Sequence, residues 1–184
     1  MATIDIDQFK AGMRRLAASV NLITTCTTDG QRSGLTATAV CSVSAAPPTL
    51  LVCVNRSGNS HAVLTSTGVF AVNVLALEDR ALADRFASPI PQEAKFEQGL
   101  WTSLVTGSPV LESAIATFDC RISHSVDVGT HGILFGEIQA LRLRGVDAQP
   151  LMFRAGNYGS TTSLQEAVGE GLLWMPTWDP YASF

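Results

Sequence analysis

Residues 34–55 read GLTATAVCSVSAAPPTLLVCVN. From Gly34 to Ser44 the segment alternates small and hydroxyl-bearing residues, where a buried strand would carry bulkier side chains. Pro47 and Pro48 end this strand, because a proline has no N–H to donate to a β-ladder. A second, apolar strand is predicted at 49–54. The segment therefore predicts two β-strands, and the small side chains of the first let a flat ligand lie close to its backbone.

The sequence on either side of this segment is also rich in strands. β-Branched residues dominate 20–28, and Asp29-Gly30 then gives a strong hairpin signal. The strand after the hairpin is predicted to run from about Arg32 to Ser44. Further strands are predicted at 69–75, 114–126, 132–144 and 151–154. Many strands at close spacing, with few helices between them, predict a mainly β fold built as an antiparallel barrel.

Short helices are predicted at three places. The first has an apolar face with spacings of three and four residues, made by Ile6, Phe9, Met13, Leu16 and Ala17. Asp5 followed by Gln8 is typical of a capping box at its start. The other two helices are predicted at 61–66 and 78–87, and the segment 88–109 is predicted to be irregular.

The composition bounds the class of protein. The chain has 184 residues, of which 46% are hydrophobic and 15% charged, whereas about 25% charge is usual in a soluble domain. The high apolar content excludes a disordered chain. Ser and Thr, 16 and 17 in number, take over much of the polar role. With so few charges, apolar surface remains to be covered, and a homodimer interface is the simplest expectation.

Charge and cysteine usage argue against several kinds of partner. The net charge is −4 and the only lysines are Lys10 and Lys95, which does not favour nucleic-acid binding. No window is apolar enough for a transmembrane helix. The four cysteines form no CxxC pair, so we expect free thiols rather than a metal site. The start of the chain lacks a signal pattern, and a cytoplasmic location is expected.

The C-terminal part differs from the rest of the chain. We expect one domain over 1–168 and an aromatic tail, defined here as residues 169–184. Prolines punctuate this tail, so it cannot form a regular helix. Its large aromatic side chains are Trp174, Trp178, Tyr181 and Phe184. The tail is expected to pack across a dimer, to cover part of a ligand cleft, or to dock on its own barrel.

Conventional catalytic motifs are scarce. The chain has no GxSxG, HExxH, Walker or GxGxxG motif, and only three histidines. Two segments nevertheless suggest binding. The hydroxyl-rich strand from Gly34 to Ser44 suits either a flat heterocycle or another subunit. The loop 55–60, with Arg56 and the helix after it, suits an anion, or it is a plain loop capped by Ser57 or Asn59. Lys95 either binds a phosphate or is a solvated loop residue.

The order and spacing of several short motifs carry a resemblance to a known family. They are Gly34-Leu-Thr-Ala-Thr-Ala, Cys41-Ser-Val-Ser44 with Pro47-Pro48, Phe70-Ala-Val-Asn-Val-Leu75, Leu82-Ala83 with Phe86-Ala87, Lys95-Phe96, Pro109-Val-Leu111, Gly129-Thr-His131, Phe135-Gly-Glu137, and Pro150-Leu151 with Tyr158. Over residues 8–160 the chain resembles the flavin reductase family of FMN-binding split-barrel proteins. Thr130 stands where the family's Gly-Asp-His motif has its aspartate.

The resemblance implies a split β-barrel and a set of cofactor-binding residues. Along the isoalloxazine it implies Thr36, Ala37, Thr38, Ala39, Val40, Cys41 and Ser42. For the ribityl chain and phosphate it implies Asn55, Ser57, Ser60 and His61, with Arg85 and Lys95 adding positive charge there. Arg56, whose charge suits the anion site of the loop, and Phe96 of the Lys95-Phe96 motif complete the candidate cofactor-binding residues. On the nicotinamide side it implies His131, Arg154 and Tyr158.

The function implied is an NAD(P)H-dependent flavin reductase that acts as a homodimer and supplies reduced flavin to a partner monooxygenase. FMN is the expected flavin, with FAD as an alternative, and either NADH or NADPH is the donor. No residue need act as acid or base, because the cofactors carry the hydride chemistry. Two alternatives stay open: an FMN-containing reductase of another acceptor, such as a corrinoid or quinone, and a flavin-binding protein without turnover.

Overall fold

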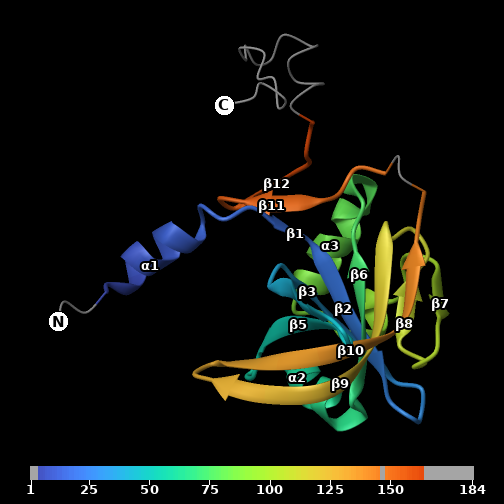
Figure 1. Ribbon diagram of the computed structural model, residues 1–184. Coiled ribbons are helices and arrows are strands. Elements are labelled where there is room, and N and C mark those ends of the chain that lie inside the picture. The colour runs from blue at the N-terminus through green and yellow to red at the C-terminus, as the bar shows by residue number, and fades with distance from the viewer. Residues whose placement is uncertain (1–3, 146–147, 164–184) are drawn as a thin grey trace, which may run out of the picture.

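A seven-stranded antiparallel sheet forms the body of the protein. The computed structural model describes residues 4–145 and 148–163. The strand order is β3-β2-β6-β9-β10-β5-β4 (Figure 1). The strands are β2 (Asn21–Cys26), β3 (Arg32–Ala37), β4 (Val40–Ala45), β5 (Pro48–Asn55), β6 (Val69–Val74), β9 (Ala116–Val128) and β10 (His131–Leu143). The prediction of a mainly β, antiparallel fold is confirmed.

The predicted strand from Arg32 to Ser44 is in fact two strands. The chain turns at Thr38 and Ala39, so that β3 pairs with β2 whereas β4 pairs with β5. These two strands lie at opposite ends of the sheet order. Local alternation is the same on both sides of such a corner, because only the change of pairing partner marks it. The prediction of one continuous strand was therefore wrong.

The β9–β10 hairpin lies within the sheet beside β5, and its turn lies next to the loop that follows β5. Its two strands have 13 residues each, and His131 at the start of β10 lies opposite Asn55 at the end of β5. Gly136 lets β10 pass close to its neighbours. A Cβ there would overlap Cζ of Phe70 and lie 2.9 Å from Cβ of Cys120. The absence of a side chain at Gly136 thus lets β10 pack directly against Phe70 and Cys120.

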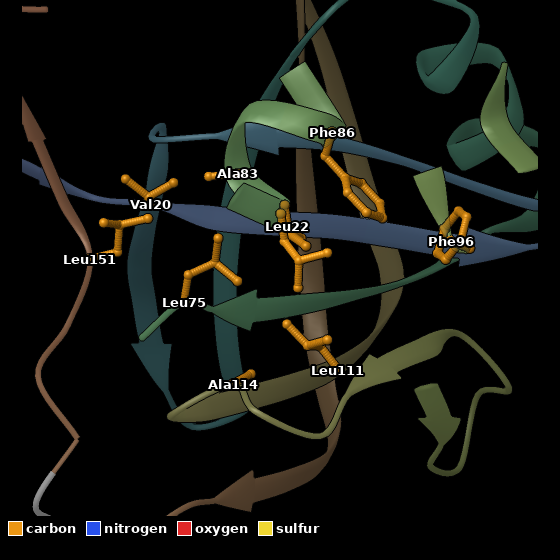
Figure 2. Close-up of a cluster of buried hydrophobic side chains, with 10 residues drawn as sticks. Val20, Leu22, Leu75, Ala83, Phe86, Phe96, Leu111, Ala114 and Leu151 are labelled. Atoms are coloured by element: carbon orange, nitrogen blue, oxygen red, sulfur yellow. The ribbon is translucent and has the colours of Figure 1, made fainter. Parts of the chain in front are cut away.

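β2 separates two hydrophobic clusters. Leu22 belongs to one, together with Phe86 and Phe96, and Ile23 belongs to the other, together with Phe70. Figure 2 shows the first cluster, which lies between the sheet and the helical segments that cover it. Burial on both faces explains why 20–28 reads as a nearly continuous β-branched run rather than an alternating one.

The helices that cover the sheet are short. They are α2 (Asn59–Thr67), the 3₁₀ turn η1 (Leu77–Asp79), α3 (Arg80–Ala87) and α4 (Gln92–Lys95). Leu82 and Phe86 lie on the buried face of α3, as their spacing predicts. The segment 88–109 contains α4 and the strand β7 (Trp101–Ser103), which pairs with β8 (Pro109–Leu111). The segment therefore has more regular secondary structure than predicted.

The N-terminal helix α1 (Ile6–Met13) lies apart from the barrel (Figure 1). It ends before Leu16 and has no buried residue, so its apolar face is exposed. The Asp5 side chain makes no capping hydrogen bond. The helix is confirmed, but the predicted capping box is wrong. After α1 the chain enters a small sheet made by β1 (Ala18–Ser19), β11 (Met152–Arg154) and β12 (Asn157–Gly159).

Two further expectations concern the chain as a whole. The four cysteines are free, as expected. Among the described residues, no helix combines the length and the hydrophobicity that crossing a membrane requires. The predicted aromatic tail, 169–184, and its boundary at 168 lie outside the described residues.

Candidate functional site

A cleft of about 590 Å³ opens where β3, the end of β5, the first turn of α2 and the segment 86–95 meet. Five of the predicted residues line it: Thr36, Asn55, Ser57, Ser60 and Lys95. They come from four separate parts of the chain, and the sheet topology brings them together. The cleft is therefore the first candidate for a ligand site.

Lys95 is the only lysine or arginine in the lining of this cleft. Its side chain is buried, with Nζ donating to the carbonyl oxygen of Phe86 over 2.9 Å and to that of Gly34 over 3.3 Å. It forms no ion pair with any residue in the described part of the chain. Burial lowers the pKa of the Lys95 ammonium group. A buried cation that contacts only neutral carbonyls is favourably placed for an anionic ligand. The alternative of a solvated loop residue is wrong.

The Gln92 side chain joins the elements around Lys95. Its Oε1 accepts from the backbone N–H of Gly34 over 2.9 Å, and its Nε2 donates to Oγ of Ser60 over 3.4 Å. Ser60 Oγ in turn donates to the Gly34 carbonyl over 3.4 Å. Gly34 is thus held at both its N–H and its carbonyl. Gln92 was not among the predicted residues, because nothing in the sequence around it signals its partners.

The loop from Asn55 to Ser60 leads directly into the start of α2. Oδ1 of Asn55 accepts from the N–H of Ser57 over 3.0 Å and from its hydroxyl over 2.9 Å, which fixes the turn. Gly58 is the N-cap, and no side chain caps the helix. The alternative of a cap by Ser57 or Asn59 is therefore wrong. Gly58, Asn59 and Ser60 line the cleft, so the positive end of the α2 dipole faces the same cleft that Lys95 lines.

A second hollow of about 560 Å³ continues from the cleft, since Asn55 and Ser57 line both. Arg56 lies here, but its guanidinium pairs with Asp127 over 3.1 Å. His61 also lines this hollow, and its Nε2 is buried beside Gly132 without a hydrogen-bond partner. Arg56 and His61 are thus near the predicted site, with the Arg56 charge already balanced.

His131 lies on the rim of this region. It is exposed and lies opposite Asn55 in the β5–β10 pairing. Its Nδ1 is 2.9 Å from Oγ1 of Thr130, the residue at the family's aspartate position. Thr130 itself lines the second hollow. The structure thus brings His131 close to the Asn55 loop.

The predicted stretch from Thr36 to Ser42 does not form one wall. Thr36 lines the cleft, and its hydroxyl donates to the Ala83 carbonyl over 2.7 Å. Thr38 and Ala39 line a different groove beside α1. Ala37 is buried in β3, whereas Val40, Cys41 and Ser42 lie on the edge strand β4. The corner at Thr38 and Ala39 separates these groups.

Two residues expected near the phosphate turn away from the cleft. The Arg85 guanidinium donates to the carbonyl oxygen of Ala94 and pairs with Glu97 over 2.7 Å. Phe96 is buried in the first hydrophobic cluster, with its ring centroid 5.0 Å from that of Phe86. Neither residue lines the cleft. Both have structural partners that their positions in the sequence did not reveal.

Arg154 and Tyr158 lie far from His131 within one chain. Both belong to the small sheet with β1, whereas His131 is at the tip of the β9–β10 hairpin (Figure 1). The Tyr158 ring packs on Phe153 at a centroid distance of 5.2 Å. Burial raises the pKa of Tyr158, and the Asp84 carboxylate beside it acts in the same direction. One chain alone does not frame a cleft with all three residues.

Comparison with known proteins gives a consistent result. The family model described as "Flavin reductase like domain" matches residues 13–162. An FMN reductase (NADH) RutF of Stutzerimonas stutzeri strain A1501 is 46% identical over 157 residues, which cover 85% of this chain and 89% of that protein.

Solved structures agree with the sequence match. A Haemophilus somnus 129pt protein, solved as a candidate flavin reductase, is 40% identical with a TM-score of 0.83, over 86% of this chain and 100% of that one. The styrene monooxygenase flavin reductase of Pseudomonas putida S12 is 26% identical with a TM-score of 0.74, over 84% of this chain and 98% of that one.

Proposed function

The chain belongs to the family of flavin reductase like domains, and we propose that it transfers hydride from NADH to FMN in the cleft around Lys95. The observation that carries this proposal is the buried Lys95 ammonium group, which faces the uncapped start of α2 and has no carboxylate partner among the described residues. A phosphate monoester supplies the missing negative charge.

The residues present fit the flavin. Lys95 and the N–H groups at the start of α2 bind the phosphate, and Asn55 and Ser57 offer polar groups to the ribityl chain. Neutral hydroxyls and backbone amides around Thr36 suit the polar edge of the ring system. When bound, the flavin supplies an electron-poor ring that accepts the hydride from the nicotinamide. The protein's task is to position the two rings in contact.

We assign the nicotinamide side to His131. It is exposed on the rim of the second hollow, where an incoming dinucleotide can reach it, and it adjoins the Asn55 loop. Because Thr130 replaces the aspartate of the family motif, no carboxylate at that position orients the imidazole. Oγ1 of Thr130 is at hydrogen-bond distance from Nδ1 instead.

The active form is a homodimer in this proposal. Apolar side chains are exposed along the edge strand β4 and the β9–β10 hairpin, including Val43, Val126 and Val128. Such surface is typical of an interface rather than of a free monomer. A second chain can also supply Arg154 and Tyr158 to a cleft from which they are distant within their own chain.

The assignment of the donor and flavin follows the named relatives. The name of the Stutzerimonas relative specifies NADH and FMN. The Pseudomonas putida structure is that of the flavin reductase of a styrene monooxygenase. By analogy this protein uses NADH and FMN and passes reduced flavin to a monooxygenase. Its free thiols are consistent with work in the cytoplasm.

Steady-state NADH oxidation with added FMN tests the proposal. We expect consumption of NADH that saturates with FMN, and protein that loses its flavin on desalting. If FMN is retained on desalting and free FMN does not accelerate turnover, a bound-flavin reductase of a corrinoid or quinone is favoured instead. If no NADH is consumed at any flavin concentration, the reductase proposal is wrong.

A further inference from the structure

A groove of about 430 Å³ lies between α1 and the small sheet. Phe9 and Met13 of α1 and the following Leu16 form one wall, and Phe153 of β11 forms part of the other. The exposed fractions of Phe9, Met13 and Leu16 are 53%, 50% and 60%. The groove shares no lining residue with the cleft around Lys95.

Main-chain contacts hold the two walls together. The N–H of Ala155, in the β11–β12 turn, donates to the carbonyl oxygen of Arg14 over 3.1 Å. Ala155 adopts a φ of 54°, a left-handed conformation that non-glycine residues rarely take. Ala18 of β1 pairs with Phe153 of β11. The exposed apolar wall is therefore attached to the sheet at a defined place.

The rim of the groove is basic. Lys10 and Arg14 line the groove itself, and Arg14, Arg15 and Arg154 line the hollow next to it. None of these four cations forms an ion pair within residues 4–145 and 148–163. Four of the chain's 12 Lys and Arg residues thus gather around one apolar surface without acidic partners. The groove is therefore suited to bind an apolar segment that carries negative charge.

We propose that the aromatic tail, residues 169–184, docks in this groove of its own chain. The tail supplies two tryptophans, a tyrosine and a phenylalanine, and it contains Glu170 and Asp179 but no lysine or arginine. Its composition is thus complementary to the groove in both hydrophobicity and charge.

The course of the chain supports this choice of occupant. β12 pairs with β11 and directly follows the turn residues Ala155 and Gly156, which line the groove, and the described chain ends four residues after β12, at Ser163. Only residues 160–168 separate β12 from the tail, and an extended chain spans about 3.3 Å per residue, so the tail can reach the groove. This covalent attachment also gives the tail a far higher effective concentration than a second molecule has.

Tryptophan fluorescence of the full chain tests the proposal. The chain has three tryptophans, and with Trp101→Phe both remaining ones are in the tail. Acrylamide quenching then measures how far water-soluble quencher reaches them. The synthetic peptide 169–184 gives the reference for an undocked tail. If Trp101→Phe fails to fold, the difference between the full chain and a chain ending at residue 168 gives the same readout.

We expect the tail tryptophans to be protected relative to the free peptide. Leu16→Ser and Arg14→Glu should each shift quenching and emission toward the values of the peptide, and added salt should act in the same direction. Leu143→Ser and Arg121→Glu are the matched controls, since both positions are exposed on the barrel away from the groove, and they should leave quenching unchanged.

Three results would overturn the proposal. Quenching of the tail tryptophans equal to that in the free peptide would show that the tail is undocked. Protection that persists in Leu16→Ser and Arg14→Glu would place the tail elsewhere. Protection that disappears on dilution, together with a change in molecular mass, makes the groove of a second copy the docking site.

Discussion

Nζ of Lys95 donates a 2.9 Å hydrogen bond to the carbonyl oxygen of Phe86, near the C-terminal end of α3. The bond holds the ammonium group at the cleft, and a second bond to the Gly34 carbonyl fixes its direction. Because both partners are neutral, the charge of Lys95 stays available to a ligand. The site is thus organised for an anion before the ligand binds.

Lys95→Ala should weaken FMN binding more than riboflavin binding, because only FMN carries the phosphate. Loss of one charge-assisted hydrogen bond costs about 1.5–3 kcal/mol, which corresponds to roughly a tenfold to hundredfold weaker affinity for FMN. Lys10→Ala removes the other lysine of the chain, from exposed α1, and should change neither affinity. Dissociation constants from flavin fluorescence quenching give the comparison. An equal loss for both flavins would refute the phosphate role.

The preference for FMN over riboflavin should decrease at alkaline pH. Burial lowers the pKa of Lys95 below its ordinary value of 10.5, so the ammonium group loses its proton as pH rises through that lowered value. The neutral amine no longer attracts the phosphate, whereas riboflavin binding does not depend on this charge. The ratio of the two affinities, measured against pH, removes the effect of the flavin ring's own ionisation. A ratio that stays constant up to the ordinary lysine pKa would contradict the assignment.

Gln92→Ala should weaken FMN binding because the Gln92 side chain positions Gly34 and Ser60, not because it contacts the flavin itself. Without the side chain, the Gly34 N–H and the Ser60 hydroxyl lose a shared partner, at a cost of about 1 kcal/mol, or roughly a fivefold change in affinity. Gln92→Glu keeps an acceptor for the Gly34 N–H but places a negative charge near the phosphate, so it should weaken FMN more than riboflavin. A purely structural Gln92 would instead give equal losses for the two flavins in both variants.

His131→Ala should raise the KM for NADH and leave FMN affinity nearly unchanged. The imidazole is exposed on the rim beyond the Asn55 loop, and Lys95 and the start of α2 do not depend on it. His124→Ala is the control, because His124 lies on β9 against the ring of Phe135 and does not line the cleft. Steady-state kinetics with varied NADH and saturating FMN separate the two. An unchanged KM in His131→Ala would remove His131 from the nicotinamide side.

Gly136→Ala should destabilise the barrel. The added methyl group collides with the Phe70 ring and with Cβ of Cys120, which cannot move unless its main chain moves. Overpacking of this kind costs about 1–3 kcal/mol. Gly12→Ala is the control within exposed α1, where an added Cβ meets nothing within 4 Å, and it should be neutral or stabilising by up to about 1 kcal/mol. Urea unfolding measures both. Equal stability of the two variants would show that β10 does not need the close approach.

Local patterns predict most elements of this fold but not its corners. The runs at 20–28 and 69–75 appear as strands because their buried β-branched residues act locally, and the Asp29-Gly30 turn joins β2 to β3. The two long strands β9 and β10 also appear where their sequences predict them. The turn at Thr38 and Ala39 was missed, since it is defined by pairing with β2 on one side and β5 on the other. The short strands β1 and β12 are below the length at which periodicity is visible.

The same distinction holds for the candidate site. The loop from Asn55 to Ser60 and the lone Lys95 are recognisable in the sequence, because their residue types already suit an anion. Gln92 acts through contacts with Gly34 and Ser60, which are distant in the sequence, so no local signal identifies it. Arg85 and Phe96 were assigned to the cofactor by position, but Glu97 and the hydrophobic cluster are their partners.

The most direct test of the reductase account is anaerobic reduction of FMN by NADH, followed through the loss of the oxidised flavin's visible absorbance. With catalytic amounts of the protein, we expect the absorbance to disappear at a rate proportional to protein concentration, and Lys95→Ala to slow this reduction at low FMN. Reduction no faster than in the protein-free mixture, with intact protein and bound flavin, would contradict the account.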